Sequence, residues 1–78
     1  MARYYFDVTD GEEHIKDEVG RELATEDDIL REVNRIMIGA AGDIADHATH
    51  GRVSVSVRQE DGGALYAGSL LFSAKKIE

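Results

Sequence analysis

The side chains best suited to hold a metal ion lie in one short stretch that contains Asp43, Asp46, His47 and His50. Residues three and four positions apart share a face of a helix, so a helix that continued to residue 50 would present Asp43, His47 and His50 to one ion. Carboxylate oxygens and imidazole nitrogens are ligands of Zn²⁺, which activates water for hydrolysis. One interpretation is therefore a metal-binding protein or a metal-assisted hydrolase. The interpretation we favour is a polar helix end, where histidines lie near the negative end of the helix dipole.

A second group of acidic residues surrounds the first predicted turn: Asp7, Asp10, Glu12, Glu13, Asp17 and Glu18. Their oxygens suit Ca²⁺ or Mg²⁺, or an acid and base pair, but their spacing does not match an EF-hand loop. Turn formation and solubility explain them with fewer assumptions. The glycine pairs form no phosphate-binding loop, and no serine lies in a G-x-S-x-G motif. We therefore assign no catalytic residue, no metal site and no cofactor.

The element that must position the histidines is a long amphipathic helix, predicted over about residues 26–48. Apolar residues recur there at the spacing of three and four that lines one helix face. Thr25 is the expected N-cap, and Gly51 is the expected stop. Gly39 and Gly42 each weaken a helix interior by about 1 kcal/mol relative to alanine. We therefore expect another backbone to approach the helix closely near its midpoint.

Four strands are predicted around this helix, over about residues 2–8, 14–17, 52–59 and 64–72. The third has the clearest period of two, with valines on one face and serines on the other. The fourth carries apolar residues on both faces, which suggests burial on both sides or a bulge at Gly68. The fold class is thus α+β: residues 1–78 form a single ββαββ domain, a four-stranded, mainly antiparallel sheet with one long helix on one face.

The face of the sheet opposite the helix is expected to be partly apolar. Tyr5, Tyr66, Leu70 and Phe72 are the candidate residues on that face. A continuous exposed apolar surface of this kind is typical of a protein–protein interface. We therefore expect the chain to associate, with itself as a homo-oligomer or with another protein, through this face or an edge strand.

Composition excludes several classes of partner. The net charge is −7, with 16 acidic and 9 basic residues, so direct binding to nucleic acid phosphates is not expected. Charged residues interrupt the helix, so a membrane-spanning segment is not expected. The chain has no cysteine and no visible signal peptide, and we expect it in the cytoplasm.

Several motifs together resemble a known family. The opening Arg3-Tyr4-Tyr5-Phe6-Asp7 with Asp10-Gly11, then Asp17-Glu18 with Gly20 and Leu23, and finally Asp61-Gly62 with Leu71-Phe72-Ser73, resemble short proteins of soil and plant-associated bacteria grouped as a domain of unknown function. The resemblance implies a stand-alone cytoplasmic α+β protein, without established activity or catalytic residues. A looser, fold-level likeness is to antitoxin domains of the HicB type.

The function expected from these features is a non-enzymatic interaction or regulatory module that self-associates. The lack of a catalytic constellation and the small core that 78 residues provide favour this hypothesis. The first alternative is the metal site or hydrolase at Asp43, His47 and His50. The second is an antitoxin-like domain that binds a partner protein.

Overall fold

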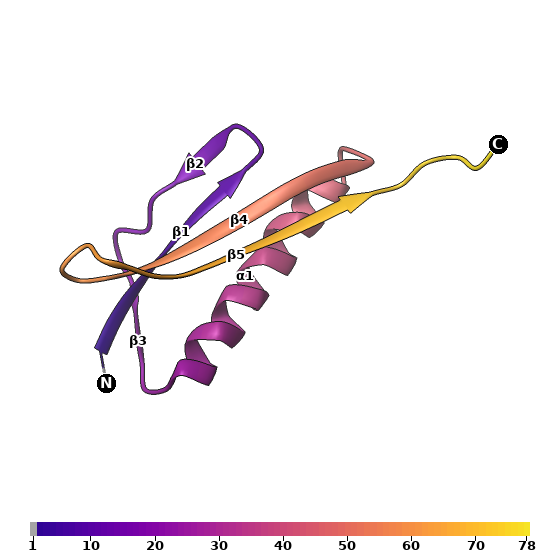
Figure 1. Ribbon diagram of the computed structural model, residues 1–78. Helices are drawn as coiled ribbons and strands as arrows, with labels where there is room; N and C mark the ends of the chain where they lie inside the picture. Colours follow the sequence, from indigo (N-terminus) through magenta and orange to yellow (C-terminus); the bar gives the residue numbers. More distant parts are fainter. Residues whose placement is uncertain (1) are drawn as a thin grey trace.

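The computed structural model describes residues 2–78 of the chain. Five strands and one helix follow each other in the order β1, β2, β3, α1, β4, β5, and Figure 1 shows the helix lying along one side of a single sheet. The elements are β1 (Ala2–Asp10), β2 (Glu13–Ile15), β3 (Arg21–Leu23), α1 (Glu26–Ala45), β4 (His50–Gln59) and β5 (Ala64–Ser73). The α+β class with an antiparallel sheet and a packed helix is confirmed.

The sheet has one more strand than predicted because its first edge is divided. The strand order is β2-β1-β4-β5, and β3 pairs with β1 as well. β2 pairs with the end of β1, whereas β3 pairs with its beginning, at Ala2 to Tyr4. Residues 21–23 are not among the four predicted strands, but these three residues are enough to pair with β1 once the chain returns along its edge.

The helix begins as predicted and ends earlier. Thr25 is the N-cap, and its Oγ1 accepts a hydrogen bond from the backbone N–H of Asp28 at 3.1 Å. α1 stops at Ala45 because the N–H groups of His47 and Ala48 both donate to the carbonyl of Ile44, at 2.9 and 3.0 Å, and close the last turn. Gly51, the expected stop, already belongs to β4. The prediction that the helix runs to residue 48 was wrong.

The core lies between α1 and the two strands β4 and β5, on which the helix mainly packs. Val53, Val55 and Val57 of β4 are 0–1% exposed, which confirms the alternation predicted for that strand. Phe6 from β1 and Ile29 and Val33 from α1 complete the buried cluster. Complete burial of one such side chain contributes about 1.5–3 kcal/mol, so this small cluster supplies much of the stability.

The close approach of helix and sheet occurs at Gly68 and not at the helix glycines. A Cβ at Gly68 would lie 3.0 Å from Val33 Cγ1 and 3.2 Å from Met37 Cε, so the missing side chain lets α1 approach β5. A Cβ at Gly39 or Gly42 would meet nothing within 4 Å. The predicted close approach near the helix midpoint therefore occurs at Val33 and Met37, but the glycine that permits it is Gly68 of β5, and the register shift lies between Val57 and Arg58 instead of at Gly68.

The register of β5 corrects the predicted composition of the two sheet faces. Tyr66 pairs with Val57, and Leu70 pairs with Val53, so both point to the side of the sheet that α1 covers. Phe72 shares that side, two residues further along the strand. Tyr5 pairs with Arg58 and lies on the opposite face. The expectation that Tyr66, Leu70 and Phe72 share a face with Tyr5 was wrong. The apolar residues on the outer face of β5 are instead Leu65 and Leu71, which are 43% and 68% exposed.

The molecule is more extended than its length requires. Its axes measure 51 × 23 × 17 Å and its radius of gyration is 14.0 Å, against about 11.5 Å for a compact domain of 78 residues. In Figure 1 the long β4–β5 hairpin and the C-terminal tail project beyond the rest of the sheet. α1, the one helix among residues 2–78, lacks the apolar length needed to cross a membrane.

Candidate functional site

The three predicted metal ligands lie on three different segments. Asp43 is in α1, His47 is in the turn that follows, and His50 is the first residue of β4. The three side chains could share one face only on a helix that continued to residue 50, but α1 ends at Ala45. Within residues 2–78 no three histidine, aspartate or glutamate side chains are grouped so that they could hold a metal ion. The arrangement on which the metal-binding alternative depended is therefore not formed.

The acidic residues of the first hairpin bind an arginine and backbone amides. Arg58 Nε donates to Asp7 Oδ2 at 2.9 Å, and Arg58 Nη2 donates to the carbonyl oxygen of Asp17 at 2.6 Å. The guanidinium carbon of Arg58 also lies 4.6 Å from the centre of the Tyr5 ring, a cation–π contact. Asp7, Asp17 and Arg58 thus join β1, β4 and the segment that follows β2 on the outer face of the sheet. This role is structural, and no local pattern around Asp7 or Arg58 predicts a pair between residues 51 positions apart.

The acidity of these two carboxyl groups follows from the same contacts. Partial burial raises the pKa of Asp7, but hydrogen bonds from Arg58 and from the backbone N–H of Asp17 outweigh it, so the pKa lies below its usual value. Burial likewise raises the pKa of Asp17, and the N–H groups of Gly20, Phe6 and Val19 outweigh that effect. Both groups therefore stay ionised in the folded protein to a lower pH than usual.

Asp17 closes the edge of the sheet where β2 and β3 are interrupted. The backbone N–H of Phe6, which has no strand opposite it there, donates to Asp17 Oδ2 at 3.1 Å. Asp17 Oδ1 accepts from the N–H groups of Val19 and Gly20, at 3.0 and 3.1 Å. Gly20 has φ +74°, and a Cβ there would lie 2.9 Å from the Arg3 and Tyr5 side chains. This edge is therefore short, broken and sealed by its own side chains.

A buried carboxylate paired with two exposed arginines fastens the same edge to the helix. Glu32 of α1 is 8% exposed, and its Oε2 lies 2.8 Å from Arg21 Nε of β3. Its Oε1 accepts from Arg35 Nη2, one turn along the helix, at 2.7 Å. Because Glu32 is satisfied on both oxygens, the pair holds β3 against α1 and leaves no free carboxylate for chemistry.

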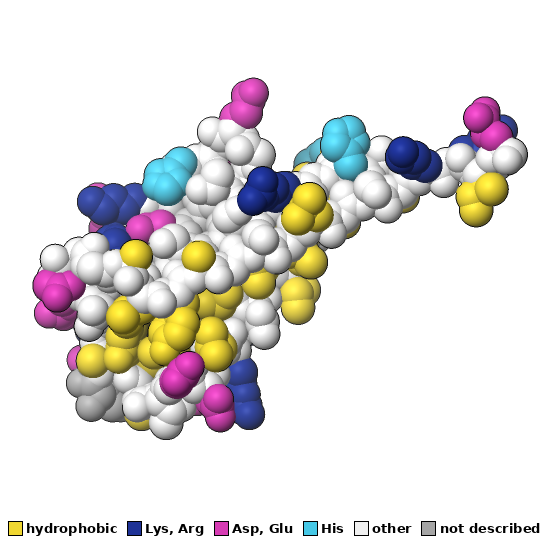
Figure 2. All heavy atoms as spheres, in the orientation of Figure 1, with side chains coloured by type: hydrophobic (Ala, Val, Ile, Leu, Met, Phe, Trp, Pro, Cys, Tyr) yellow, Lys and Arg dark blue, Asp and Glu magenta, His cyan; other side chains and the backbone are white. Residues whose placement is uncertain are grey.

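The opposite edge, formed by β5, has none of these features. β5 pairs only with β4 within residues 2–78, and its ten residues include no charged residue and no proline. Leu65 and Leu71 are 43% and 68% exposed. On α1, Leu30 and Met37 lie on the flank next to β5, since Met37 contacts Gly68 and Leu30 is two turns before it on that flank. Figure 2 shows apolar side chains gathered in this region, between β5 and α1. We call β5 and this flank of α1 the open edge.

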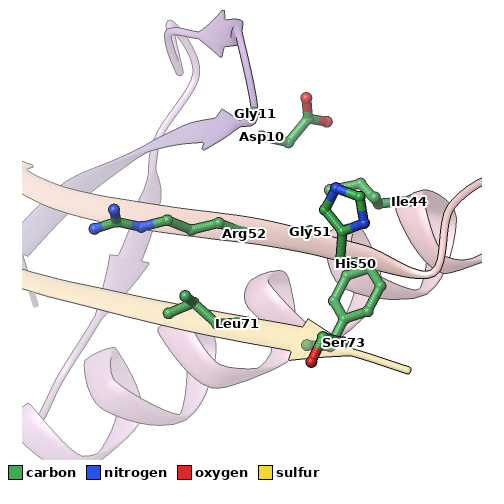
Figure 3. A pocket seen from close by; sticks show the side chains of 9 residues that line it. Asp10, Gly11, Ile44, His50, Gly51, Arg52, Leu71 and Ser73 are labelled. Carbon is green, nitrogen blue, oxygen red and sulfur yellow. The ribbon is translucent and has the colours of Figure 1, made fainter. Parts of the chain in front are cut away.

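A cavity of about 730 Å³ lies at the far end of the open edge. Its apolar wall consists of Ile44, Leu71 and Phe72, and Asp10, His50 and Arg52 stand at its polar rim (Figure 3). A Cβ at Gly51 would lie 2.8 Å from Ile44 and 2.9 Å from Phe72, so glycine is needed where β4 passes this wall. The rim side chains come from the ends of β1 and β4, and Ser73 of β5, the cross-strand partner of His50, also lines the cavity. No hydrogen bond joins the His50 and Ser73 side chains in the part of the chain that the structure describes.

These features define a small α+β domain with one sealed and one open sheet edge. Residues 3–71 match the family described as Domain of unknown function (DUF6894), and the chain belongs to this family. The resemblance drawn from the sequence motifs is thereby confirmed at the level of a domain of unknown function. No curated protein and no solved structure matched the chain.

The interface candidates named from the sequence divide in two. Tyr66, Leu70 and Phe72 lie along β5, whereas Tyr5 lies two strands away, on β1 beneath Arg58. Sequence reasoning missed Leu71, although a signal was present: ten residues from Ala64 to Ser73 without a charge are unusual for a strand at an exposed edge.

Proposed function

We propose that this protein is an interaction module that associates with a second copy of itself through the open edge. The observation that carries the proposal is the contrast between its two sheet edges. Natural proteins protect edge strands by shortening them, breaking them or placing charges on them. The β2/β3 edge has all three protections, whereas β5 is ten residues long and uncharged, and its one register shift, at Leu65, lies close to its start. A strand of this kind is suited to pair with another strand.

The exposed surface of the chain supports the same proposal. The accessible surface is 5699 Å², about 1000 Å² more than the roughly 4700 Å² expected for a folded monomer of 8.6 kDa. A stable interface of standard size buries about 800 Å² on each partner. The β4–β5 hairpin and the tail project beyond the rest of the sheet (Figure 1), so a second copy that covers them would bring the exposed surface closer to the usual value.

Pairing of two β5 strands around a two-fold axis also brings two helices together. The helix packs on β4 and β5, so the helices of two copies would lie on the same face of one continuous sheet. Leu30, which is 39% exposed, lies on the flank that would face the second helix. Tyr66, Leu70 and Phe72 are the interface residues of β5 on that face.

Light scattering coupled to size exclusion tests this proposal. We expect a molar mass twice the 8.6 kDa of the chain, and the same mass after treatment with EDTA, because no metal takes part in the proposed contact. A mass of one chain at every concentration up to the millimolar range would contradict the proposal. A dimer that appears only after addition of Zn²⁺ would instead favour the histidine site.

A further inference from the structure

We infer that the two copies pair their β5 strands antiparallel with Gly68 at the two-fold axis, and that the basic C-terminal tail of each copy binds the acidic β4–β5 turn of the other. This inference rests on the proposed function and specifies its register. Two separate observations, the exposed leucines of β5 and the charges at the two ends of the hairpin, favour the same alignment.

The geometry of a two-fold axis limits the choices. When two identical strands pair antiparallel around such an axis, one residue lies opposite its own copy, and residues equally far on either side of it lie opposite each other. Gly68 is near the middle of the ten-residue strand Ala64–Ser73, so an axis there pairs almost its full length. Any other register near the middle must place Ala67 or Ser69 opposite its own copy.

The exposed leucines favour the axis at Gly68. Leu65 and Leu71 are each three residues from Gly68, so each leucine of one copy would lie opposite the other leucine of the second copy. Side chains opposite each other in an antiparallel pair have Cβ atoms about 4.5–5.5 Å apart, close enough to bury both. Tyr66 would lie opposite Leu70 in the same way, on the side of the helix. With Ser69 at the axis, Leu71 would lie opposite Ala67 and lose this contact.

The charges favour the same axis. The hairpin turn contains Glu60 and Asp61, and the tail contains Lys75 and Lys76. Beyond the paired strands, the same alignment brings the tail with Lys75 and Lys76 alongside the turn that holds Glu60 and Asp61 of the second copy. The four side chains belong to exposed residues, and none of them takes part in the ion pairs found within residues 2–78.

One copy alone cannot form these ion pairs. In Figure 1 the β4–β5 turn and the C-terminal tail lie at opposite ends of the long hairpin. The backbone N–H of Ala74 donates to the carbonyl of Thr49 at 2.7 Å, so the tail leaves the sheet in line with β5 and away from its own turn. An antiparallel second copy reverses this direction and brings each tail to the other turn. Only a dimer of this orientation therefore places the basic tail of each copy beside the acidic turn of the other.

A charge exchange tests the ion pairs. The three proteins to compare with wild type carry K75E/K76E, E60K/D61K, or all four substitutions, and the dimer dissociation constant is measured by sedimentation equilibrium at about 50 mM salt, where exposed charges are weakly screened. We expect each double variant to raise the dissociation constant about tenfold or more, and the fourfold variant to return within about threefold of wild type. In 0.5 M salt the four proteins should differ little.

A cross-link tests the register without using the charges. The chain has no cysteine, so copies with Leu65→Cys can be mixed with copies carrying Leu71→Cys and oxidised. Opposite positions in an antiparallel pair suit a disulfide. We expect the mixed dimer to exceed both disulfide-linked homodimers. If the fourfold variant is no better than the double variants, or if the homodimer of Leu71→Cys prevails, the inferred register is wrong while a dimer of wild type still supports the proposed function. If wild type is monomeric, the proposed function itself fails.

Discussion

Replacement of Asp17 with alanine is expected to lower the free energy of unfolding by roughly 2–4 kcal/mol, out of the roughly 4–12 kcal/mol available to a chain of this length. The side chain accepts three backbone hydrogen bonds, from Phe6, Val19 and Gly20. The substitution removes the acceptor of all three hydrogen bonds. Because the Phe6 N–H is part-buried, water is a poor replacement for the lost carboxylate oxygen. Urea unfolding followed by circular dichroism measures the change.

The controls for Asp17→Ala separate its hydrogen bonds from the loss of a charge. Glu18→Ala removes a neighbouring carboxylate whose residue is exposed, and it should change stability by less than about 0.5 kcal/mol. Asp17→Asn keeps an oxygen for Val19 and Gly20 but not one for Phe6. The decrease in unfolding free energy should therefore lie between those of Asp17→Ala and Glu18→Ala. Equal effects of Asp17→Ala and Glu18→Ala would contradict the sealing role of Asp17.

The pH dependence of stability follows from the same carboxyl groups. The folded-state pKa values of Asp7 and Asp17 lie below the ordinary value of 3.8. A lowered folded pKa contributes stability that is present above pH 3.8 and is lost as the pH falls through the folded values. The unfolding free energy of wild type should therefore drop in this acidic range, and that of Asp17→Asn should drop less. Equal slopes for the two proteins would show that Asp17 is not part of this stability.

Leu71→Lys is expected to weaken the dimer about 100-fold, equivalent to about 2.7 kcal/mol. Leu71 is exposed in the single chain, so lysine is compatible with the folded monomer. In a β5–β5 pair the substitution places an ammonium group opposite Leu65 in each of the two equivalent apolar contacts, and charged residues on an edge strand oppose strand pairing. Sedimentation equilibrium of the variant measures the dissociation constant.

Ile15→Lys is the matched control for Leu71→Lys. Ile15 is also an exposed apolar residue on an edge strand, 50% exposed, but it lies on β2 at the sealed edge. The substitution Ile15→Lys should leave the dimer dissociation constant unchanged. If both variants weaken the dimer equally, or if Ile15→Lys alone does so, β5 is not the interface.

Local signals in the sequence predicted the parts of the fold that depend on neighbouring residues. The alternation of Val53, Val55 and Val57 predicted a buried strand face, because burial of one face leaves a period of two. Thr25 predicted the helix start, because its hydrogen bond to Asp28 spans only three residues. Such features need no knowledge of the tertiary structure.

Features that depend on pairing between distant segments were not predictable in the same way. β3 is a strand only because β1 offers it an edge, and no local pattern in its three residues indicates this. The faces of Tyr66 and Leu70 depend on a register shift at Arg58, since a shift of one residue reverses the face of a strand. The metal site failed for a related reason, because closure of the last helix turn at Ile44 separates His47 and His50 from Asp43.

Amide hydrogen exchange along β5 is the most direct test of the central claim that this edge pairs with a second copy. Alternate N–H groups of an edge strand point away from its neighbour and exchange freely unless another strand accepts them. We predict that the outward N–H groups within Ala64–Ser73 are protected at high protein concentration and exchange faster on dilution, whereas those of β2 exchange fast throughout. Outward N–H groups of β5 that exchange as fast as those of β2 at every concentration would contradict the claim.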